Sequence, residues 1–286
     1  MTRLTFAAVS ALTVLRQAGL YGRTAVRVAQ RGWGEAGGDR ELATERPVFV
    51  VGSPRSGTTF LAGAVGSQPG FVDLGEVRPV KASIERWESL PEEQAAQEVR
   101  ATIERVRAFA FVRDLRSVEQ TPELSFVVRA AVRAYPRATV LHIIRDGRDV
   151  VCSLLEKGWL RDRSGHDDVG KPYGTFVRSW VEPERRDEFV RASDATRAAW
   201  AWRRYVTAAR AVPAHTLEVR YEETAADPAA VADTIAARLR TEPEPLRASL
   251  TAVHGRSVGR WRRELTPEQI DDVEREAAPL LRELGY

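Results

Sequence analysis

Lysine and cysteine are scarce in this chain of 286 residues. The only cysteine is Cys152, and the only lysines are Lys81, Lys157 and Lys171 among 43 basic residues. A single cysteine excludes a disulfide framework within the chain and a metal cluster built from cysteines, so a reducing, cytoplasmic setting is expected. Almost all positive charge is carried by arginine, which indicates a GC-rich coding bias.

The sequence also lacks an apolar run long enough to predict a transmembrane span. The apolar N-terminal segment, 4–15, is too short, because crossing a bilayer takes about 20 residues. No clean signal-peptide cleavage site follows it. We expect an N-terminal helix that packs on the domain, and a glycine-rich, charged linker at 32–46. A peripheral membrane contact through Arg16, Arg23 and Arg27 is the alternative.

The composition is that of a folded domain with a slight excess of positive charge. Hydrophobic residues make up 43% and charged residues 29% of the chain, as in soluble globular proteins. The net charge of +3 reflects either an arginine-rich surface or arginines that converge on an anionic ligand. Nothing besides this charge suggests nucleic-acid binding. The expected division is a helical extension and linker, 1–46, and one domain, 47–286, with its oligomeric state open.

Apolar strands that alternate with helices predict the fold class. Buried strands are expected at Val48–Val51, 138–145 and 215–221, which are short runs rich in apolar and β-branched residues. This alternation is typical of an α/β, P-loop-type three-layer domain, in which helices flank a central, mainly parallel sheet. Ligands of such sheets bind at the carboxyl ends of the strands. Helices are expected at 58–67, 79–87, 91–109, 122–134, 150–157, 192–212 and 228–239, and after the capping residue Thr266.

The first candidate site is the turn "GSPRSGTT", which follows the first strand. Gly52 and Gly57 are separated by four residues, and glycine lets backbone N–H groups approach an anion closely. The N-terminus of the following helix adds a positive dipole. A Walker A loop would carry lysine where Thr58 stands, and no acidic residue ends a strand to hold magnesium. The turn therefore predicts an anion site that differs from a nucleoside-triphosphate site.

The segment "PRSGTT" resembles the 5′-phosphosulfate loop of sulfotransferases that use 3′-phosphoadenosine 5′-phosphosulfate (PAPS). The resemblance implies that the donor is bound by Arg55, Ser56, Gly57, Thr58 and Thr59. It also implies that Arg55 neutralises the charge that develops between the sulfuryl group and the leaving phosphate. Sulfuryl transfer, like phosphoryl transfer, needs mainly alignment and charge stabilisation, so no metal is obligatory if arginine and backbone amides supply them.

A second segment, "VLHIIRDGRDVVCSLL", resembles the 3′-phosphate site of the same family. Arg145 ends a predicted strand and Ser153 follows eight residues later, about two helical turns on. An arginine at this place can bind a phosphate with two parallel hydrogen bonds. The alternative is a surface cluster in which Arg145 pairs with its charged neighbours. Those neighbours, Asp146, Arg148 and Asp149, are expected to have structural or supporting roles.

Two further segments extend the resemblance over about 48–266. "VRYEE" resembles the family's Arg-Tyr-Glu segment, and there the tyrosine, here Tyr221, lies near the nucleotide. "HGRSVGRWRRELT" resembles the C-terminal loop that closes over the cofactor. This second match implies a Gly-basic-Trp element that begins at Gly259, and it makes Arg256 and Arg260 candidates for binding the 3′-phosphate.

A base must accept the proton that the acceptor hydroxyl loses. "FVDLGEVRPV" resembles the Gly-Glu element of the tyrosylprotein type, which makes Glu76 the expected base; the alternative for it is a surface glutamate that caps the helix near Pro79. Glu119 is the rival base, since "VEQTPELS" resembles an E-K-T-P element of bacterial relatives in which Gln120 here replaces the lysine. His142 lies within a predicted strand and is interpreted as a core residue.

The acceptor pocket is expected between the irregular segment 158–180 and the helices at 79–111, because loops on a rigid scaffold carry specificity. The aromatic residues in these segments favour an aromatic or lipid-like alcohol, or another small molecule, over a bare sugar. The aromatic residues that are candidates for this lining are Trp87, Phe109, Phe111, Trp159, Tyr173 and Trp180.

These motifs together predict a sulfotransferase that moves the sulfuryl group of PAPS to a hydroxyl, or alternatively an amine, by in-line displacement with a carboxylate base. The nucleotide product is adenosine 3′,5′-bisphosphate (PAP). A P-loop nucleotide kinase-like enzyme would explain the first loop but not the spacing of Arg145 and Ser153. A non-catalytic nucleotide-binding relative is the third interpretation.

Overall fold

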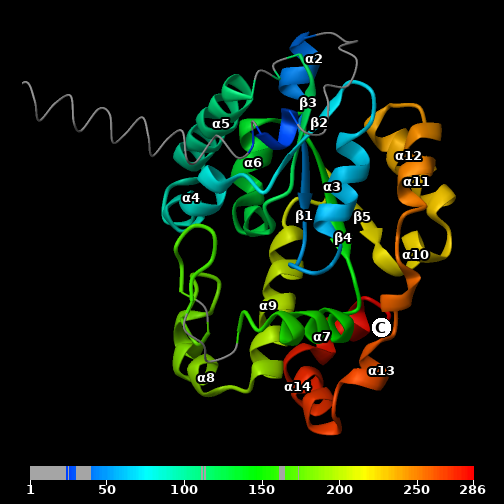
Figure 1. Cartoon of the computed structure of the whole chain (residues 1–286). Coiled ribbons are helices and arrows are strands. Elements are labelled where there is room, and N and C mark those ends of the chain that lie inside the picture. Colours follow the sequence, from blue (N-terminus) through cyan, green and yellow to red (C-terminus); the bar gives the residue numbers. More distant parts are fainter. Residues whose placement is uncertain are drawn as a thin grey trace, which may run out of the picture.

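A five-stranded parallel sheet forms the centre of the computed structural model, which describes residues 24, 26–29, 40–110, 112, 114–160, 165–172 and 174–286. The strand order is β2-β3-β1-β4-β5, and each neighbouring pair is parallel (Figure 1). The predicted α/β fold with a central sheet between helices is therefore confirmed. The strands are β1 (Val48–Val51), β2 (Phe71–Gly75), β3 (Arg116–Glu119), β4 (Thr139–Ile144) and β5 (Thr216–Arg220).

Helices cover both faces of the sheet and its carboxyl edge (Figure 1). The α-helices are α2 (Arg40–Glu45), α3 (Thr58–Gly66), α4 (Arg78–Glu88), α5 (Glu92–Phe109), α6 (Val128–Ala134), α7 (Gly147–Lys157), α8 (Arg186–Arg191), α9 (Asp194–Ala209), α10 (Tyr221–Ala226), α11 (Pro228–Leu239), α12 (Glu244–Leu250), α13 (Trp261–Glu264) and α14 (Pro267–Glu283). Short 3₁₀ helices are η1 (Pro122–Val127), η2 (Pro183–Arg185) and η3 (Gly255–Ser257).

The central strand β1 divides the core into two layers. Phe49 and Val51 pack in a buried cluster with α4, α5 and α6, whereas Val48 and Val50 pack on the other face with α3, α11 and α12. Successive side chains of a strand point to opposite faces, so a strand that is apolar throughout needs helices on both. A third cluster joins α7, α9 and α14 around Ile144, where β4 ends.

The three predicted strands are confirmed, but β2 and β3 were missed. The sequence of β2 carries Asp73 at its centre, which argues against a buried strand. This carboxylate is nevertheless buried, because Arg27 pairs with it at 2.8 Å and the Gly75 N–H donates to it at 2.7 Å. Its burial thus depends on a residue 46 positions away, which a local pattern does not reveal.

The described part of the N-terminal segment packs on the domain. Residues 26–29 are helical, Val28 is buried in the core, and Arg27 is engaged with Asp73 rather than free for a membrane surface. Arg16 and Arg23, the other residues of the alternative membrane contact, lie outside the described residues. The prediction of a linker at 32–46 is wrong for residues 40–45, which form α2. Within the described part of the chain, every helix is too short or too polar to cross a bilayer.

Several helix boundaries differ from prediction for identifiable reasons. Helix α7 begins at Gly147 rather than 150, because the Asp146 side chain accepts a hydrogen bond from the Arg148 N–H and caps the helix. A Cβ at Gly147 would lie 2.7 Å from the Trp202 ring, so glycine lets α7 pack closely on α9. The predicted helix 122–134 divides into η1 and α6. The predicted caps of α11 and α14, at Asp227 and Thr266, are confirmed.

Candidate active site

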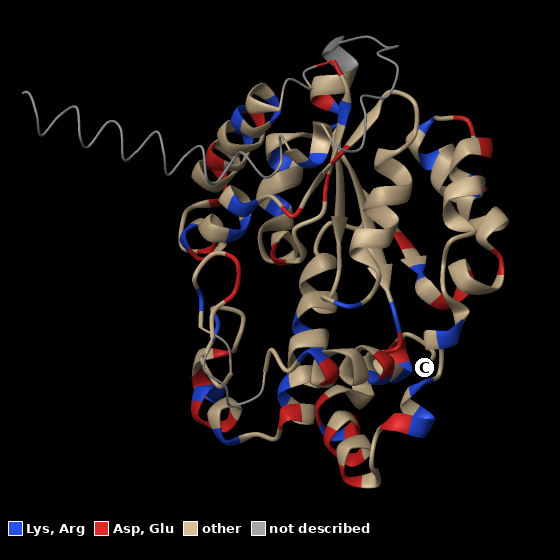
Figure 2. Cartoon of the chain, viewed as in Figure 1, with Lys and Arg blue, Asp and Glu red and all other residues tan. Residues whose placement is uncertain are grey.

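The loops that follow β1 and β4 lie side by side at the carboxyl edge of the sheet. The two strands pair from Val48↔Thr139 to Val51↔His142, and Figure 2 shows basic residues in both loops. The Nε of Arg55 donates a hydrogen bond to the Ser153 hydroxyl at 2.9 Å, across 98 positions of sequence. Arg145 donates from Nη1 to the Arg55 carbonyl at 3.3 Å. The two predicted anion-binding segments are thus in direct contact.

Two glycines allow the first loop to lie this close. A Cβ at Gly52 would be 2.4 Å from the Ile143 carbonyl oxygen, and this residue has a φ of +141°. A Cβ at Gly57 would be 3.0 Å from the Tyr221 ring, and its φ of +103° is one that other residues rarely adopt. Glycine is therefore required where the loop contacts β4 and where it contacts the residue after β5.

The loop presents donors suited to an anion. Helix α3 starts at Thr58 with Gly57 as its N-cap, and no side chain caps its first N–H groups. Those N–H groups and the helix dipole favour negative charge at this end. The buried hydroxyl of Ser56 has no hydrogen-bond partner among the described residues. The Thr59 hydroxyl donates to the Gln120 amide oxygen at 3.4 Å.

The segment around Tyr221 meets the second loop. The guanidinium carbon of Arg145 lies 4.7 Å from the centre of the Tyr221 ring, a cation–π arrangement. The Tyr221 hydroxyl donates to the His254 carbonyl at 3.0 Å, and Arg145 donates to the Ser257 carbonyl. Arg145 itself is 95% buried, and its Nε has no partner among the described residues. Loop 254–261 is therefore fastened to both Arg145 and Tyr221.

Asp149 fastens the other end of the same loop. This carboxylate is completely buried and accepts hydrogen bonds from the Gly259 N–H at 2.7 Å and the Trp261 N–H at 3.0 Å. Burial raises the pKa of Asp149, and the two backbone donors oppose that rise. The sequence predicts a supporting role for Asp149 but does not identify these two partners, because they lie 110 and 112 positions away.

The two arginines predicted in this loop point differently from Arg145. Arg260 pairs with Glu156 at 3.2 Å and with Glu264, so its charge is committed to acidic neighbours. Arg256 is exposed on η3. The structure thus brings Gly259 and Tyr221 to the Arg145 site, but it turns the Arg260 guanidinium toward the outer face of α7.

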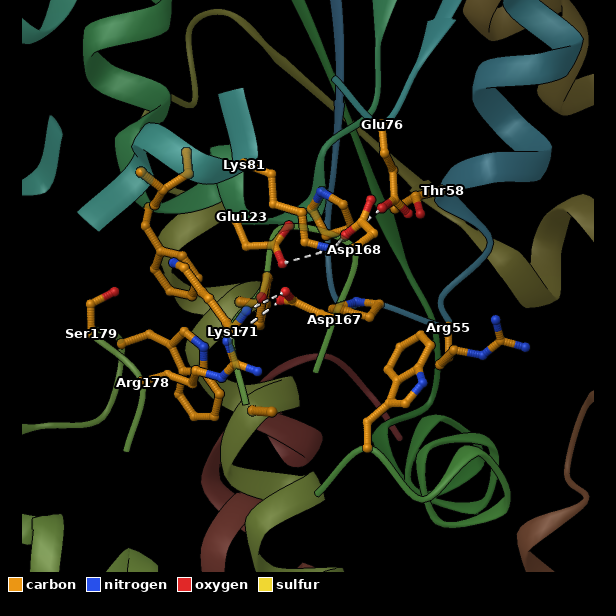
Figure 3. A pocket seen from close by; sticks show the side chains of 18 of the residues that line it. Arg55, Thr58, Glu76, Lys81, Glu123, Asp167, Asp168, Lys171, Arg178 and Ser179 are labelled. Carbon is orange, nitrogen blue, oxygen red and sulfur yellow. Dashed lines mark hydrogen bonds and ion pairs between the residues drawn. The ribbon is translucent and has the colours of Figure 1, made fainter. Parts of the chain in front are cut away.

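A pocket of about 320 Å³ opens beside the first loop and includes Arg55, Thr58 and Thr59 in its lining. Glu76, which follows β2, lies in the same lining, and Figure 3 shows its carboxylate next to Thr58. The Glu76 side chain is 38% exposed, and the Lys81 ammonium lies 3.6 Å from its carboxylate. Glu76 is therefore accessible to a molecule in the pocket.

Glu119, the rival base, is outside the pocket lining and only 1% exposed. Its Oε1 accepts hydrogen bonds from the Thr121 N–H at 3.0 Å and from the Thr121 hydroxyl, which itself accepts from the Val77 N–H at 3.0 Å. Burial raises the pKa of Glu119 to about 8. This chain of hydrogen bonds links Glu119 to the backbone next to Glu76.

The aromatic lining differs from the expected set. Trp159 and Trp180 line the pocket, as do Phe126 and Tyr205, which sequence analysis missed because they belong to η1 and α9. Trp87 is 1% exposed and donates to Glu98 on α5, so it belongs to the core. Phe109 is 47% exposed and absent from the lining. Phe111 and Tyr173 lie outside the described residues.

The prediction that His142 is a core residue is confirmed, and the single cysteine is buried as well. His142 is completely buried in β4, and burial lowers its pKa. Cys152 is 5% exposed, and burial raises the pKa of its thiol to about 12. Neither residue lines the pocket, so both belong to the core.

Comparison with known proteins establishes the family. A model of the sulfotransferase family matches residues 47–245, and the chain belongs to that family. Members of this family are transferases whose sulfuryl donor is PAPS. No curated protein matches the sequence significantly.

Two solved sulfotransferase structures agree with this chain in fold, and a third has a TM-score just below theirs. The sulfotransferase domain from the curacin biosynthetic pathway has a TM-score of 0.50 at 16% identity, over 82% of this chain and 96% of its own. Sulfotransferase STF9 from Mycobacterium avium has a TM-score of 0.50 at 14% identity, over 84% and 77%. Mouse sulfotransferase SULT7A1, solved in complex with PAP, has a TM-score of 0.49 at 16% identity, over 84% and 89%.

We predict that Asp149→Asn loosens loop 254–261. The substitution keeps the shape but removes the charge and presents an amide N–H₂ toward backbone donors, which should cost about 1.5–3 kcal/mol of local stability. Trypsin should cleave after Arg256 and Arg260 several-fold faster than in the unmodified protein, as followed by mass spectrometry. The exposed Asp233→Asn serves as control. Unchanged cleavage in Asp149→Asn would contradict the fastening role.

We also predict that Glu119 makes folding stability fall as pH rises. The native carboxyl keeps its proton up to about pH 8, whereas the unfolded chain loses it near pH 4.5. Stability from this group is therefore complete below pH 4.5 and lost as pH rises toward 8, by at most about 1.4 kcal/mol per unit. Urea unfolding of Glu119→Gln at pH 5, 6, 7 and 8 should show a shallower pH slope. The exposed Glu244→Gln should keep the original slope, and equal slopes in both variants would refute the prediction.

Proposed function

We propose that this protein transfers the sulfuryl group of PAPS to a hydroxyl group of a small acceptor. The observation that carries the proposal is the 2.9 Å hydrogen bond from Arg55 to Ser153. This bond connects two segments. The first is a loop suited to a phosphosulfate, and the second carries Arg145 at the end of a strand and Ser153 on a helix, a pair suited to a second phosphate. A nucleotide with phosphate groups at both the 3′ and 5′ positions matches two adjacent anion sites of this kind.

The residues at hand fit such a donor. The uncapped N–H groups of α3, with the hydroxyls of Ser56, Thr58 and Thr59, would hold the 5′-phosphosulfate. Arg145 and Ser153 would hold the 3′-phosphate, with Tyr221 and Gly259 beside them. Of the candidate arginines in the C-terminal loop, Arg256 is exposed on η3, whereas Arg260 would first have to leave Glu156 and Glu264. PAPS itself supplies the sulfuryl group.

Arg55 and Glu76 would carry the chemistry at the boundary between loop and pocket. The acceptor oxygen forms its bond to sulfur as the bond from sulfur to the 5′-phosphate oxygen breaks, and PAP leaves. Glu76 takes the proton that the acceptor hydroxyl loses. Arg55 stabilises the negative charge that gathers on the leaving phosphate. Both side chains belong to the pocket lining, which supports this division of roles.

An aromatic or lipid-like alcohol remains the acceptor class we favour. Part of the pocket lining is aromatic and apolar, and it consists of Phe126, Trp159, Trp180 and Tyr205. A pocket of about 320 Å³ suits a small molecule. A P-loop nucleotide kinase-like enzyme and a non-catalytic nucleotide-binding relative are the alternatives, and the two experiments below separate all three.

The donor prediction is tested by ligand-dependent thermal unfolding. PAP at about 100 times its dissociation constant should stabilise the protein by roughly 2.7 kcal/mol, whereas Mg-ATP at the same concentration should have little effect. Arg145→Met combined with Ser153→Ala should abolish the PAP shift, and the free variant should melt at a lower temperature than the unmodified protein because Arg145 also holds loop 254–261. Stabilisation by Mg-ATP but not by PAP would favour the kinase-like alternative.

The catalytic prediction is tested by transfer from radiolabelled PAPS to a panel of phenols and alcohols. Glu76→Gln should lower kcat about 100-fold or more while PAP binding is retained, because a general base contributes about that much. Arg55→Met should lower kcat by a similar factor. Glu92→Gln, on the exposed face of α5, is the matched control. Full activity of Glu76→Gln would move the base elsewhere, and PAP binding without any transfer would favour a non-catalytic protein.

A further inference from the structure

The acceptor pocket is lined by more negatively charged than positively charged side chains. Arg55 is turned toward Ser153 and belongs to the donor side. Among the described residues that line the remainder of the pocket, five carboxylates face three cations. The carboxylates are Glu76, Glu85, Glu123, Asp167 and Asp168, and the cations are Lys81, Lys171 and Arg178.

All five carboxylates lie within about 4 Å of a cation, but only Glu85, Asp167 and Asp168 pair with a cation that no other carboxylate of the pocket shares. Glu85 lies 2.8 Å from Lys171, and Asp167 lies 3.6 Å from Arg178. Asp168 lies 2.9 Å from Lys81, and it is also 3.4 Å from Arg78, which lies outside the lining. The excess of negative charge therefore falls on the two remaining carboxylates, Glu76 and Glu123.

Those two carboxylates share Lys81 with Asp168. Figure 3 shows the Lys81 ammonium between Glu123 and Asp168. Its distances are 3.6 Å to Glu76 and 3.9 Å to Glu123, both longer than its 2.9 Å contact with Asp168. Burial alone would lower the pKa of Lys81, but the three carboxylates together raise it above its ordinary value. One ammonium thus serves three anionic groups.

Glu123 is the member of this group without another role. Glu76 has a place in the proposed transfer, and Asp168 has Arg78 in addition to the shared Lys81. The Glu123 side chain is 22% exposed, and its Oε2 receives no hydrogen bond from the described residues. Burial raises its pKa, and Lys81 only partly opposes that rise. A carboxylate so placed gains most from a further positive charge or donor.

Aromatic rings stand beside this carboxylate. Phe126 lies on η1 with Glu123, its ring meets Tyr205 edge-on at 4.7 Å, and Tyr205 in turn packs against Trp180 at 6.1 Å. Ring faces attract cations and also bury an apolar body. The combination of rings with an under-neutralised carboxylate matches an aromatic molecule that ends in an ammonium group.

We propose that the acceptor pocket selects phenolic or similar alcohols that carry a protonated amine, or no charge, against those that carry a carboxylate, and that Glu123 determines this preference. The inference rests on the proposed function for what then happens to the bound molecule. The binding preference itself depends only on the charges and rings of the pocket.

Three phenols of similar size test the proposal: tyramine is a cation, 4-ethylphenol is neutral, and 3-(4-hydroxyphenyl)propionate is an anion. Their binding is measured by calorimetry with the full-length protein in low salt, with and without PAP, and their kcat/KM values are measured with PAPS. Tyramine should bind at least about tenfold more tightly than the propionate, a difference of about 1.4 kcal/mol. The difference should shrink as salt is added.

Two substitutions of opposite charge sharpen the test. Glu123→Gln should reduce the ratio of tyramine to propionate affinity at least about fivefold and leave 4-ethylphenol within about twofold. Lys81→Met should raise the same ratio, because it deepens the negative excess. Lys157→Met, outside the pocket lining, should leave the ratio unchanged. The melting temperature of each variant shows that it is folded.

Equal binding of the three phenols, tighter binding of the propionate, or no binding of any of them would overturn the proposal. An unchanged ratio in both Glu123→Gln and Lys81→Met would overturn it as well. Failure of the proposed function is distinguishable, because it would appear as absent PAP binding and absent transfer while the order of phenol affinities persists. Conversely, sulfuryl transfer without charge preference would leave the function standing and reject this inference.

Discussion

The parallel pairing of β1 with β4 is the constraint on which the rest of the site depends. Adjacent parallel strands deliver their following loops to one edge of the sheet, and here the pairing is close enough that a Cβ at Gly52 would lie 2.4 Å from the Ile143 carbonyl. The contacts of Arg55 with Ser153 and of Arg145 with the first loop follow from that closeness. An anion held by α3 is therefore also next to α7.

Two buried carboxylates hold the flanks of this edge in the same manner. Asp149 accepts from two backbone N–H groups of the loop that ends at Trp261, and Glu119 accepts from Thr121, which in turn accepts from the backbone next to Glu76. Each buried carboxyl group thus accepts hydrogen bonds from main-chain N–H groups, directly or, for Glu119, also through the Thr121 hydroxyl.

Local sequence identified the two segments that meet beside β1 and β4 but not the residues that build the pocket wall, and the physical reason is the distance over which each is assembled. The strand, the glycine turn and the helix start of the first loop are contiguous, and Arg145 with Ser153 spans two helical turns. In contrast, Asp73 is buried because of Arg27, and the pocket wall combines Lys81 with Glu123 and with Asp168, which comes from a segment that looked irregular. Pairings of this kind depend on the tertiary fold and leave no periodic pattern.

The segment 165–172 meets α4 through ion pairs, Asp168 with Lys81 and Arg78, and Lys171 with Glu85. Partly exposed pairs of this kind contribute little to folding stability, in contrast to the buried strands beneath them. Mutations in this wall can therefore accumulate without unfolding the domain, while the glycine loop tolerates almost none. Under the proposed function, this arrangement would allow the choice of acceptor to change through a few charges of the pocket wall while the donor site stays the same.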